Sequence, residues 1–292
     1  MQIAPRIGFI GFGEAGSNIA KGLRAAGVEA LAAFDIKTDD PLIRKRAAET
    51  GTTLVGAPAE LAAITDIFLS VVTANAAAEA AEQMAPSLNS SQLYADLNSV
   101  SPALKQQIDR MITGSGASFV EAAVMAPVPP YAHKVPMLLG GAGASRFAEA
   151  LSPYGMRFEI VGEMVGTAAA VKMCRSIIVK GLEALLVECV LGASHYGAEQ
   201  RVFASLTETF PGIDWNKLAD YMVGRVVVHG ERRAHEMEEV AETLRTIGID
   251  PIMATATARR QAWSAELDLK SKFGPEGPKT YQEVLEVIQK LH

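Results

Sequence analysis

Cysteine is scarce in this chain, and the residues that usually hold metals are not clustered. Two cysteines, Cys174 and Cys189, occur among 292 residues, and five histidines lie elsewhere. The cysteines form no CxxC pair and no zinc-like grouping with histidine. The sequence therefore predicts neither a disulfide framework nor a metal site.

A surplus of positive charge is also absent. The chain has 27 lysines and arginines against 33 aspartates and glutamates, which gives a net charge of −6. Binding to nucleic acid depends largely on cations that neutralise phosphates, so nucleic acid is not expected as the main partner. Hydrophobic residues make up 49% and charged residues 21%, as in ordinary globular proteins.

The sequence has no charge-free apolar run of the roughly 20 residues that a membrane-spanning helix needs. The most apolar stretch, 164–194, is interrupted by five charged residues, the first of which is Lys172. The N-terminal segment MQIAPRIGFIGFG is broken by glycines and has no small-residue cleavage site, so it does not resemble a signal peptide. These features predict a soluble cytoplasmic protein without a membrane partner.

Short β-type runs alternate with helical patterns in the first half of the chain. The expected strands cover 6–10, 30–35, 67–72, 93–96, 118–122 and 136–140, and the expected helices cover 14–26, 41–50, 76–84 and 101–111. This alternation predicts parallel βαβ units in a doubly wound Rossmann sheet, an α/β domain over residues 1–162. Ligands bind such a sheet at the carboxyl ends of its strands.

Helical patterns dominate from residue 163 onward. The expected helices are 163–196, 198–209, 215–225, 231–247, 251–266 and 280–291, with breakers at Pro211–Gly212, Gly248 and 274–278. The sequence thus predicts an all-α domain over residues 163–292. Its first helix is apolar on nearly all sides, and a domain this small has little means of burying it alone, so a homodimer is expected.

A glycine-rich turn follows the first expected strand and opens the first expected helix. The residues are GFGEAG, a GxGxxG pattern. The first glycine allows a tight turn, the second lets a pyrophosphate approach the backbone, and the third lets helix and strand pack closely. Free N–H groups and the helix dipole then attract the phosphates. The predicted cofactor-binding residues here are Gly11, Gly13, Glu14, Ala15 and Gly16.

An aspartate stands where a dinucleotide-binding protein holds the ribose. Asp35 lies nineteen residues after Gly16, at the end of the second expected strand. Its carboxylate would accept hydrogen bonds from a ribose 2′-hydroxyl and repel a 2′-phosphate, which favours NAD. Basic side chains at Lys37 and 44–46 leave NADP possible. The basic residues 44–46 can equally belong to a solvated helix face.

Two further loops leave the expected ligand edge of the sheet. Thr73 and Asn75 follow the third expected strand and suit a cofactor ribose, although both also suit a helix N-terminus. Asn98 and Ser99 follow the fourth and suit a substrate carboxylate or hydroxyl. Ser101 precedes a proline and is predicted to cap the next helix.

A line of polar residues runs along the apolar helix that begins the second half. Lys172, Ser176 and Glu183 lie close to one line at 100° per residue, with Arg175 and Lys180 beside it. A buried helix with such a line requires a neighbouring cleft that is filled with water or ligand. In such a cleft Lys172 could act as an acid–base group. A structural salt bridge is the alternative.

The chain resembles the β-hydroxyacid dehydrogenases, the group of 3-hydroxyisobutyrate and 6-phosphogluconate dehydrogenases, along nearly its whole length. IGFIGFGEAG matches the cofactor loop, DLNSVSP (96–102) matches the substrate loop D-x-S-T-x-x-P, and the segment from Gly166 to Lys172 matches the element with the catalytic lysine. The resemblance extends to a subgroup with a C-terminal domain of unknown function. It implies catalysis by Lys172 and a site that a second basic residue from the C-terminal domain reaches, here His235, although a histidine on an amphipathic helix can equally be a surface or packed residue.

The chain also departs from this family. Arg175 and Ser176 stand where many relatives have asparagine, and EAAVMAP (121–127) replaces a loop whose glycines grip the substrate carboxylate. The predicted substrate contacts are Asn98, Ser99, Arg175, Ser176 and His235.

The predicted function is NAD(P)-dependent hydride transfer to or from a small acidic substrate, a hydroxy acid or its semialdehyde or keto form. An imine reductase has a similar architecture but usually lacks the lysine. A nucleotide-binding redox sensor without catalysis is the second alternative.

Overall fold

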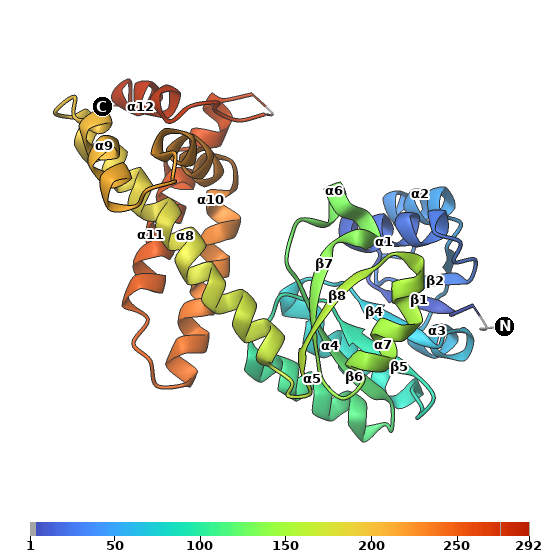
Figure 1. Cartoon of the computed structure of the whole chain (residues 1–292). Helices are drawn as coiled ribbons and strands as arrows, with labels where there is room; N and C mark the ends of the chain where they lie inside the picture. Colours follow the sequence, from blue (N-terminus) through green and yellow to red (C-terminus); the bar gives the residue numbers. More distant parts are fainter. Residues whose placement is uncertain (1–3, 275, 292) are drawn as a thin grey trace. The chain divides into compact units, whose positions relative to one another are not determined.

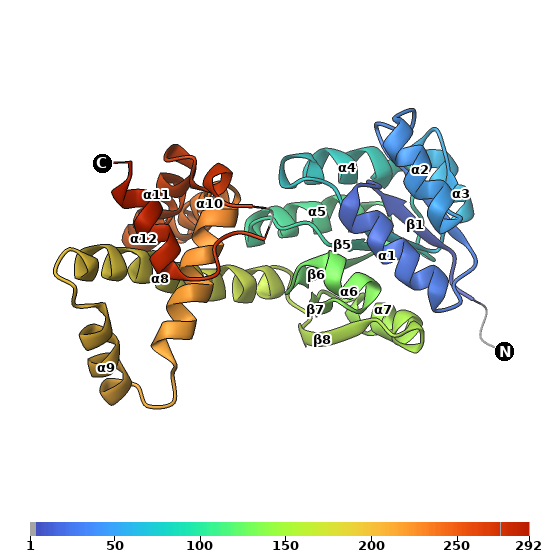
Figure 2. The ribbon, with the colours of Figure 1, turned by 90° about the horizontal axis from the view of Figure 1, so that it is seen from above.

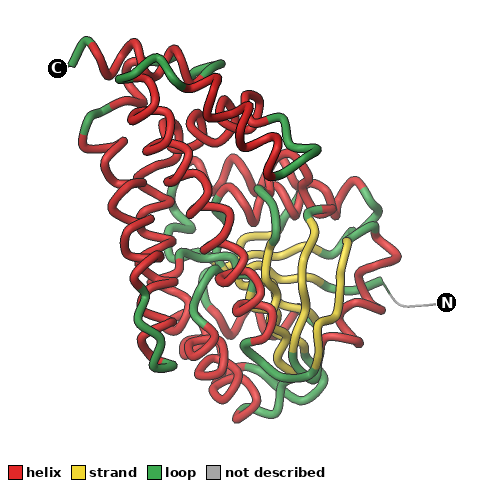
Figure 3. The backbone as a smooth tube through the Cα atoms, turned by 60° about the vertical axis from the view of Figure 1, so that its left-hand side comes forward, coloured by secondary structure: helices red, strands yellow, loops and turns green. Residues whose placement is uncertain are grey.

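The computed structural model describes residues 4–274 and 276–291, and the chain divides into two compact units, Met1–Lys172 and Met173–His292. The boundary lies within one long helix, ten residues beyond the end of the first predicted domain. Strands occur in the first unit, and the described part of the second unit is helical (Figures 1 and 3).

The first unit is an α/β domain built on one eight-stranded sheet in the order β3-β2-β1-β4-β5-β6-β7-β8. All neighbouring strands pair in parallel except β6 and β7, which are antiparallel. The strands are β1 (Ile7–Ile10), β2 (Leu31–Phe34), β3 (Thr53–Leu54), β4 (Ile67–Ser70), β5 (Leu93–Asp96), β6 (Ser118–Val124), β7 (Pro136–Gly140) and β8 (Arg157–Gly162). The predicted doubly wound fold is confirmed.

Helices cover both faces of this sheet. They are α1 (Glu14–Ala25), α2 (Pro41–Thr50), α3 (Pro58–Ile64), α4 (Ala77–Met84), α5 (Pro102–Gly114), α6 (Val128–Tyr131) and α7 (Ala144–Leu151). Residues of α1, α2 and α7 share one apolar cluster with the strands, and residues of α3, α4 and α5 share the cluster on the opposite face. In Figure 2, α4 and α5 lie side by side. Two separate layers of helix therefore bury the sheet.

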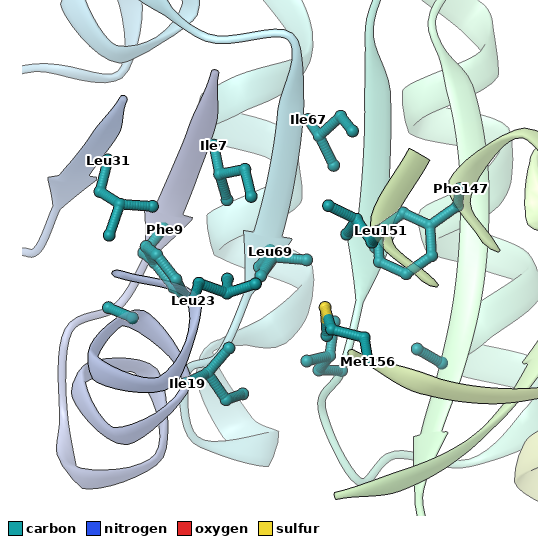
Figure 4. Close-up of a cluster of buried hydrophobic side chains, with 14 of the residues drawn as sticks. Ile7, Phe9, Ile19, Leu23, Leu31, Ile67, Leu69, Phe147, Leu151 and Met156 are labelled. Carbon is teal, nitrogen blue, oxygen red and sulfur yellow. The ribbon is translucent and has the colours of Figure 1, made fainter. Parts of the chain in front are cut away.

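The first cluster forms because neighbouring strands alternate apolar side chains toward α1 and α7. Figure 4 shows the strand residues Phe9 and Leu69 beside Leu23 of α1, with Phe147 and Leu151 of α7 in the same cluster. A sheet with apolar side chains on both faces is stable only when helices cover both. The central strands are accordingly buried throughout.

Three predictions about the first unit were wrong or incomplete. Strand β7 was expected to be parallel, but the connection 125–135 from β6 is short, and parallel strands need a longer crossover. The edge strands β3 and β8 were missed because β3 has two residues and β8 is largely exposed. Helices α3 and α7 were missed as well.

The second unit consists of helices around two apolar cores. The helices are α8 (Thr167–Ser194), which begins in the first unit, α9 (Glu199–Thr209), α10 (Trp215–Thr246), α11 (Ile252–Glu266) and α12 (Tyr281–Gln289). The larger core gathers side chains from α8, α9, α10 and α12, and the smaller one joins the end of α10 to the start of α11. Helix α10 was predicted as two helices, but it continues through Gly230, where α11 passes so closely that a Cβ atom would lie 2.5 Å from the Gln261 carbonyl oxygen.

Candidate functional site

The glycine turn between β1 and α1 has the geometry that its sequence predicts. Gly11 has φ +85°, and a Cβ atom there would lie 2.6 Å from the Val71 carbonyl oxygen. A Cβ atom on Gly16 would lie 2.8 Å from the Gly11 carbonyl oxygen, so helix and turn meet at van der Waals distance. A Cβ atom on Gly13 would meet nothing within 4 Å. The middle glycine therefore faces open space, where a pyrophosphate can approach the backbone.

The N-terminus of α1 is open to an anion. Gly13 is the N-cap residue, and no described side chain caps the helix there. The first backbone N–H groups of a helix have no partner within the helix, and their dipoles favour negative charge. Glu14 is exposed and Ala15 half-buried. The residues of this turn thus fit the diphosphate of a dinucleotide.

Asp35 lies directly after β2 and is bound to the glycine turn. Its Oδ2 accepts a hydrogen bond from the Phe12 N–H at 2.7 Å, and its Oδ1 accepts one from the Lys37 N–H at 2.8 Å. A carboxylate accepts several hydrogen bonds, so both oxygens retain capacity for ribose hydroxyls. The structure places Asp35 beside the turn that it was predicted to serve.

The residues after β4 lie at the same edge of the sheet. Thr73 and Asn75 are both exposed, and the Thr73 side chain makes no capping hydrogen bond to the 3₁₀ turn Ala74–Ala76. The structure therefore contradicts the alternative in which the Thr73 side chain caps the following turn. Ser101, by contrast, caps α5 as predicted, because its Oγ accepts a hydrogen bond from the Leu104 N–H at 3.2 Å.

Asn98 is buried in the loop after β5 and joins this loop to β4. Its Oδ1 accepts a hydrogen bond from the Val72 N–H at 2.8 Å, while its Nδ2 donates to Ser70 Oγ at 3.0 Å and Asp96 Oδ1 at 2.5 Å. These contacts hold two loops of the ligand edge together. The predicted contact between Asn98 and substrate stays a prediction.

A buried ion pair supports the same loop and was not predicted. Asp96 and Lys105 are each 1% exposed, and Lys105 Nζ lies 3.1 Å from Asp96 Oδ2 and donates to the Asp96 carbonyl oxygen at 2.7 Å. Buried charges are stable only when paired in this way. A lysine four residues into an ordinary amphipathic helix gave no sequence signal of this role.

Lys172 and Ser99 are in direct contact. Lys172 Nζ donates a hydrogen bond to Ser99 Oγ at 2.5 Å, and the two residues are separated by 73 positions in the sequence. Ser99 is exposed and Lys172 half-buried. An amine and a hydroxyl at the carboxyl edge of a dinucleotide-binding sheet can hold a substrate oxygen and exchange its proton. The structure thus brings together the predicted catalytic residue and one predicted substrate contact.

The other predicted substrate contacts lie in the second unit. Arg175 and His235 are exposed, and Ser176 accepts a hydrogen bond from Lys180 Nζ at 3.2 Å. Their proposed contact with substrate remains a prediction.

The polar line along α8 was expected to face water or a ligand, and for Lys180 and Glu183 this was wrong. Lys180 pairs with Glu236 of α10 at 2.7 Å. The fully buried Glu183 accepts hydrogen bonds from Arg225, Arg233 and Gln261 at 3.1, 2.7 and 3.0 Å. Burial raises the pKa of Glu183 above its usual value, while Gln261 and Arg225 act in the opposite direction. This half of the line is a structural ion network.

The described residues contain no group of three or more histidine, cysteine or acidic side chains that could hold a metal ion. No helix within 4–274 and 276–291 is long and apolar enough to cross a membrane.

The sheet, the glycine turn and Asp35 together define a dinucleotide-binding protein of the doubly wound class. The chain belongs to the family described as the NAD binding domain of 6-phosphogluconate dehydrogenase, which it matches over residues 6–162. Residues 193–264 match a second family, a domain of unknown function (DUF1932). Both matches confirm the resemblance found in the sequence, and the first establishes NAD(P) as the cofactor class.

Similar proteins support the same assignment. A conserved hypothetical protein from Sinorhizobium meliloti is 43% identical, and the match covers 89% of this chain and 88% of that one with a TM-score of 0.82. A conserved protein of unknown function, described as structurally similar to 3-hydroxyacid dehydrogenases, is 30% identical with a TM-score of 0.78 and coverages of 91% and 98%. The mitochondrial 3-hydroxyisobutyrate dehydrogenase of Drosophila melanogaster is 29% identical over 217 residues, 73% of this chain and 65% of the fly protein.

Proposed function

We propose that this NAD(P)-dependent oxidoreductase is a dehydrogenase that transfers a hydride between the nicotinamide cofactor and a small hydroxy acid or its semialdehyde or keto form. The observation that carries the proposal is the contact of Lys172 Nζ with Ser99 Oγ at 2.5 Å. An alcohol oxidation needs one group that removes the hydroxyl proton and another that orients the oxygen. A lysine amine and a serine hydroxyl supply both functions.

The proposed chemistry divides between the cofactor and the chain. A nicotinamide cofactor, held by the turn Gly11–Gly16 and by Asp35, would supply the hydride acceptor in oxidation and the hydride donor in reduction. The neutral Lys172 amine accepts the hydroxyl proton as the carbon–oxygen bond becomes a carbonyl, and the Lys172 ammonium returns it in the reverse direction. Ser99 donates a hydrogen bond to the same substrate oxygen and keeps it within reach of Lys172.

The proposed substrate class is a small acid, and the proposed preferred cofactor is NAD. Asp35 supports NAD, because its carboxylate would repel a 2′-phosphate. The segment 121–127 lacks the glycines of the standard 3-hydroxyisobutyrate dehydrogenase loop, and its first four residues belong to strand β6. The substrate is therefore proposed to differ from 3-hydroxyisobutyrate while the reaction type is retained.

The experiment that tests this function is a turnover screen with purified protein. Hydroxy acids, sugar acids and phosphorylated acids are each offered with NAD and NADP, and cyclic imines with NADH and NADPH. Oxidation of at least one hydroxy acid, lost in Lys172→Met, supports the proposal. Turnover of imines alone would make the protein an imine reductase. Tight cofactor binding without any turnover would favour the redox sensor.

A further inference from the structure

A glutamate is buried in the middle of the sheet, where a charged side chain is unusual. Glu121 belongs to β6, has an exposed fraction of 0%, and lies opposite Asp96 of β5 and Gly140 of β7 in the sheet register. An ionised carboxylate in such a place is stable only when hydrogen bonds or opposite charge replace the lost water. The residues that supply this compensation therefore indicate what Glu121 does.

Both oxygens of Glu121 bind the start of α8. Oε2 accepts a hydrogen bond from the Gly166 N–H and Oε1 accepts one from the Ala169 N–H, each at 2.7 Å. These N–H groups lie at the helix N-terminus, where they have no partner within the helix and where the dipole favours a negative charge. Glu121 thus caps α8 from inside the sheet, although it precedes Gly166 by 45 residues.

The capped turn is the one that leads to Lys172. Ala169 and Lys172 are three residues apart, a spacing that places side chains on the same side of a helix. The Lys172 side chain reaches Ser99 from the turn that follows directly. A small rotation or shift of the turn would therefore move the amine relative to the Ser99 hydroxyl.

Ser99, the other partner in that contact, is held in place by Asp96, which lies opposite Glu121 in the sheet register. Asp96 Oδ1 accepts hydrogen bonds from the Asn98 N–H at 3.0 Å and from Asn98 Nδ2 at 2.5 Å. Asn98 directly precedes Ser99. Two neighbouring acidic residues of the sheet consequently hold the two partners, Asp96 on the side of Ser99 and Glu121 on the side of Lys172.

We propose that Glu121 is a positioning residue, which fixes the first turn of α8 and thereby holds Lys172 Nζ against Ser99 Oγ. Its consequence for catalysis rests on the proposed function, in which Lys172 handles the substrate proton. Gly140 belongs to the same arrangement, because a Cβ atom there would lie 2.8 Å from Glu121 Oε2. Only glycine at position 140 leaves enough space for the Glu121 carboxylate in its present position.

Two substitutions disturb this arrangement in different ways. Glu121→Gln keeps the shape of the side chain but replaces one acceptor by a donor, so one of the two N–H groups loses its partner. Gly140→Ala keeps the carboxylate and displaces it. Leu139→Ala is the matched control, because Leu139 is the neighbouring residue of β7 and packs into the apolar cluster on the α1 face. It weakens the fold without touching Glu121.

The first measurement is independent of turnover. The rate of acetylation of Lys172 by a small acylating reagent is followed by peptide mass spectrometry, with Ser99→Ala as the reference for a lost Lys172–Ser99 contact. Glu121→Gln and Gly140→Ala should both change the rate toward that of Ser99→Ala, by about threefold to tenfold, the equivalent of one hydrogen bond. Leu139→Ala should retain the rate of the wild type. Unchanged Lys172 reactivity in both variants would overturn the proposal.

The second measurement uses the substrate found in the turnover screen. Glu121→Gln should lower kcat by roughly 10-fold to 100-fold, as a misplaced catalytic group does, with KM and the cofactor Kd nearly unchanged. Leu139→Ala should lower the Tm and leave kcat per folded molecule intact. An equal kcat in wild type and Glu121→Gln would refute the positioning role. If the wild type turns over no hydroxy acid, the proposed function fails, and the acetylation rates still decide the role of Glu121. If Glu121→Gln does not fold, Gly140→Ala provides both readouts.

Discussion

The carboxylate of Asp35 and the backbone N–H of Phe12 are joined by a 2.7 Å hydrogen bond, so the residue predicted to choose the cofactor also holds the turn that binds it. Replacement of Asp35 by serine would remove both effects. We expect Asp35→Ser to weaken NAD binding by roughly tenfold or more, the usual cost of losing a charged hydrogen-bond partner. NADP binding should weaken less, because repulsion of the 2′-phosphate is removed. Calorimetric Kd values for both cofactors test this.

Asp35→Asn separates the two roles. Asparagine retains an oxygen that can accept from the Phe12 N–H but carries no charge. The Asp35→Asn variant should keep the turn intact and reduce the difference in affinity between NAD and NADP. Tighter binding of NADP than of NAD by the wild-type protein would show that the prediction is wrong.

Lys172 is expected to be required for chemistry but not for cofactor binding. Lys172→Met keeps a long apolar stem and removes the proton carrier, so turnover should fall by at least ~10²-fold, about 2.7 kcal/mol of barrier. Lys172→Arg should not restore activity, because a guanidinium does not release its proton near neutral pH. Single-turnover kinetics and the Kd for NAD are the measurements.

The melting curve of each Lys172 variant is the control. A Lys172→Met protein with activity within a few-fold of the wild type would mean that another group carries the proton, and His235 would be examined first. A variant that does not fold would instead mark Lys172 as a structural charge.

Gly22 of α1 is predicted to be necessary for the packing of His133. A Cβ atom on Gly22 would lie 2.0 Å from His133 Nδ1 and 3.0 Å from the His133 backbone nitrogen. We expect Gly22→Ala to destabilise the protein by about 1–3 kcal/mol, as overpacking does, even though alanine favours helix by about 1 kcal/mol. Gly114→Ala, at the end of α5, meets nothing within 4 Å and should be neutral or stabilising. Urea unfolding compares the two, and equal stabilities would contradict the prediction.

His133 should make stability depend on pH. Burial, together with the charge of Lys134, holds the pKa of His133 below its usual value. Below about pH 6.5 the unfolded chain therefore binds a proton more readily than the folded chain, and stability should decrease as the pH falls from that value. His133→Gln should reduce the loss between pH 7.5 and 5.5 in urea unfolding. His195→Gln, at an exposed histidine, is the control and should leave the loss unchanged.

The second unit is expected to form a homodimer through α8. Ile178 and Leu185 lie seven residues apart on this helix and are 72% and 54% exposed. Two such side chains on one helix face suit a partner helix. Light scattering at micromolar concentration should give twice the chain mass of 31.0 kDa. Ile178→Glu and Leu185→Glu should reduce the mass, whereas Leu42→Glu, at an exposed leucine of α2, should not. A stable monomer of the wild type would refute the dimer.

The glycine turn and the alternation of strands and helices could be predicted because their causes are local. Gly11 and Gly16 are required by backbone geometry within a few residues of themselves, and Asp35 follows at a fixed distance. The direction of β7 depends on the length and path of a connection, which hydrophobic periodicity does not report. Helix α10 was predicted as two helices, 215–225 and 231–247, whereas it is continuous, and the glycine within it, Gly230, is explained by the close passage of α11.

The contacts that organise the site were harder to predict because they join distant positions. Glu121 caps a helix that begins more than forty residues later, and Lys105 pairs with an aspartate of the preceding strand. The one available signal for Glu121 was a charged residue inside the apolar strand sequence SFVEAAV. Such a residue has to find a buried partner, which makes it a useful marker in related sequences.

The polar network around Glu183 lies where the two apolar cores of the second unit meet, since its partners Arg233 and Gln261 come from α10 and α11 between the segments that form each core. Apolar side chains tolerate a helix that slides by one turn, whereas a buried carboxylate loses its partners and leaves charges unpaired. The network therefore fixes the register in which the helices of the second unit pack against one another. An evolving sequence could exchange the apolar residues on either side of it with little effect on which helices meet, but a change to Glu183 alone would permit several competing alignments.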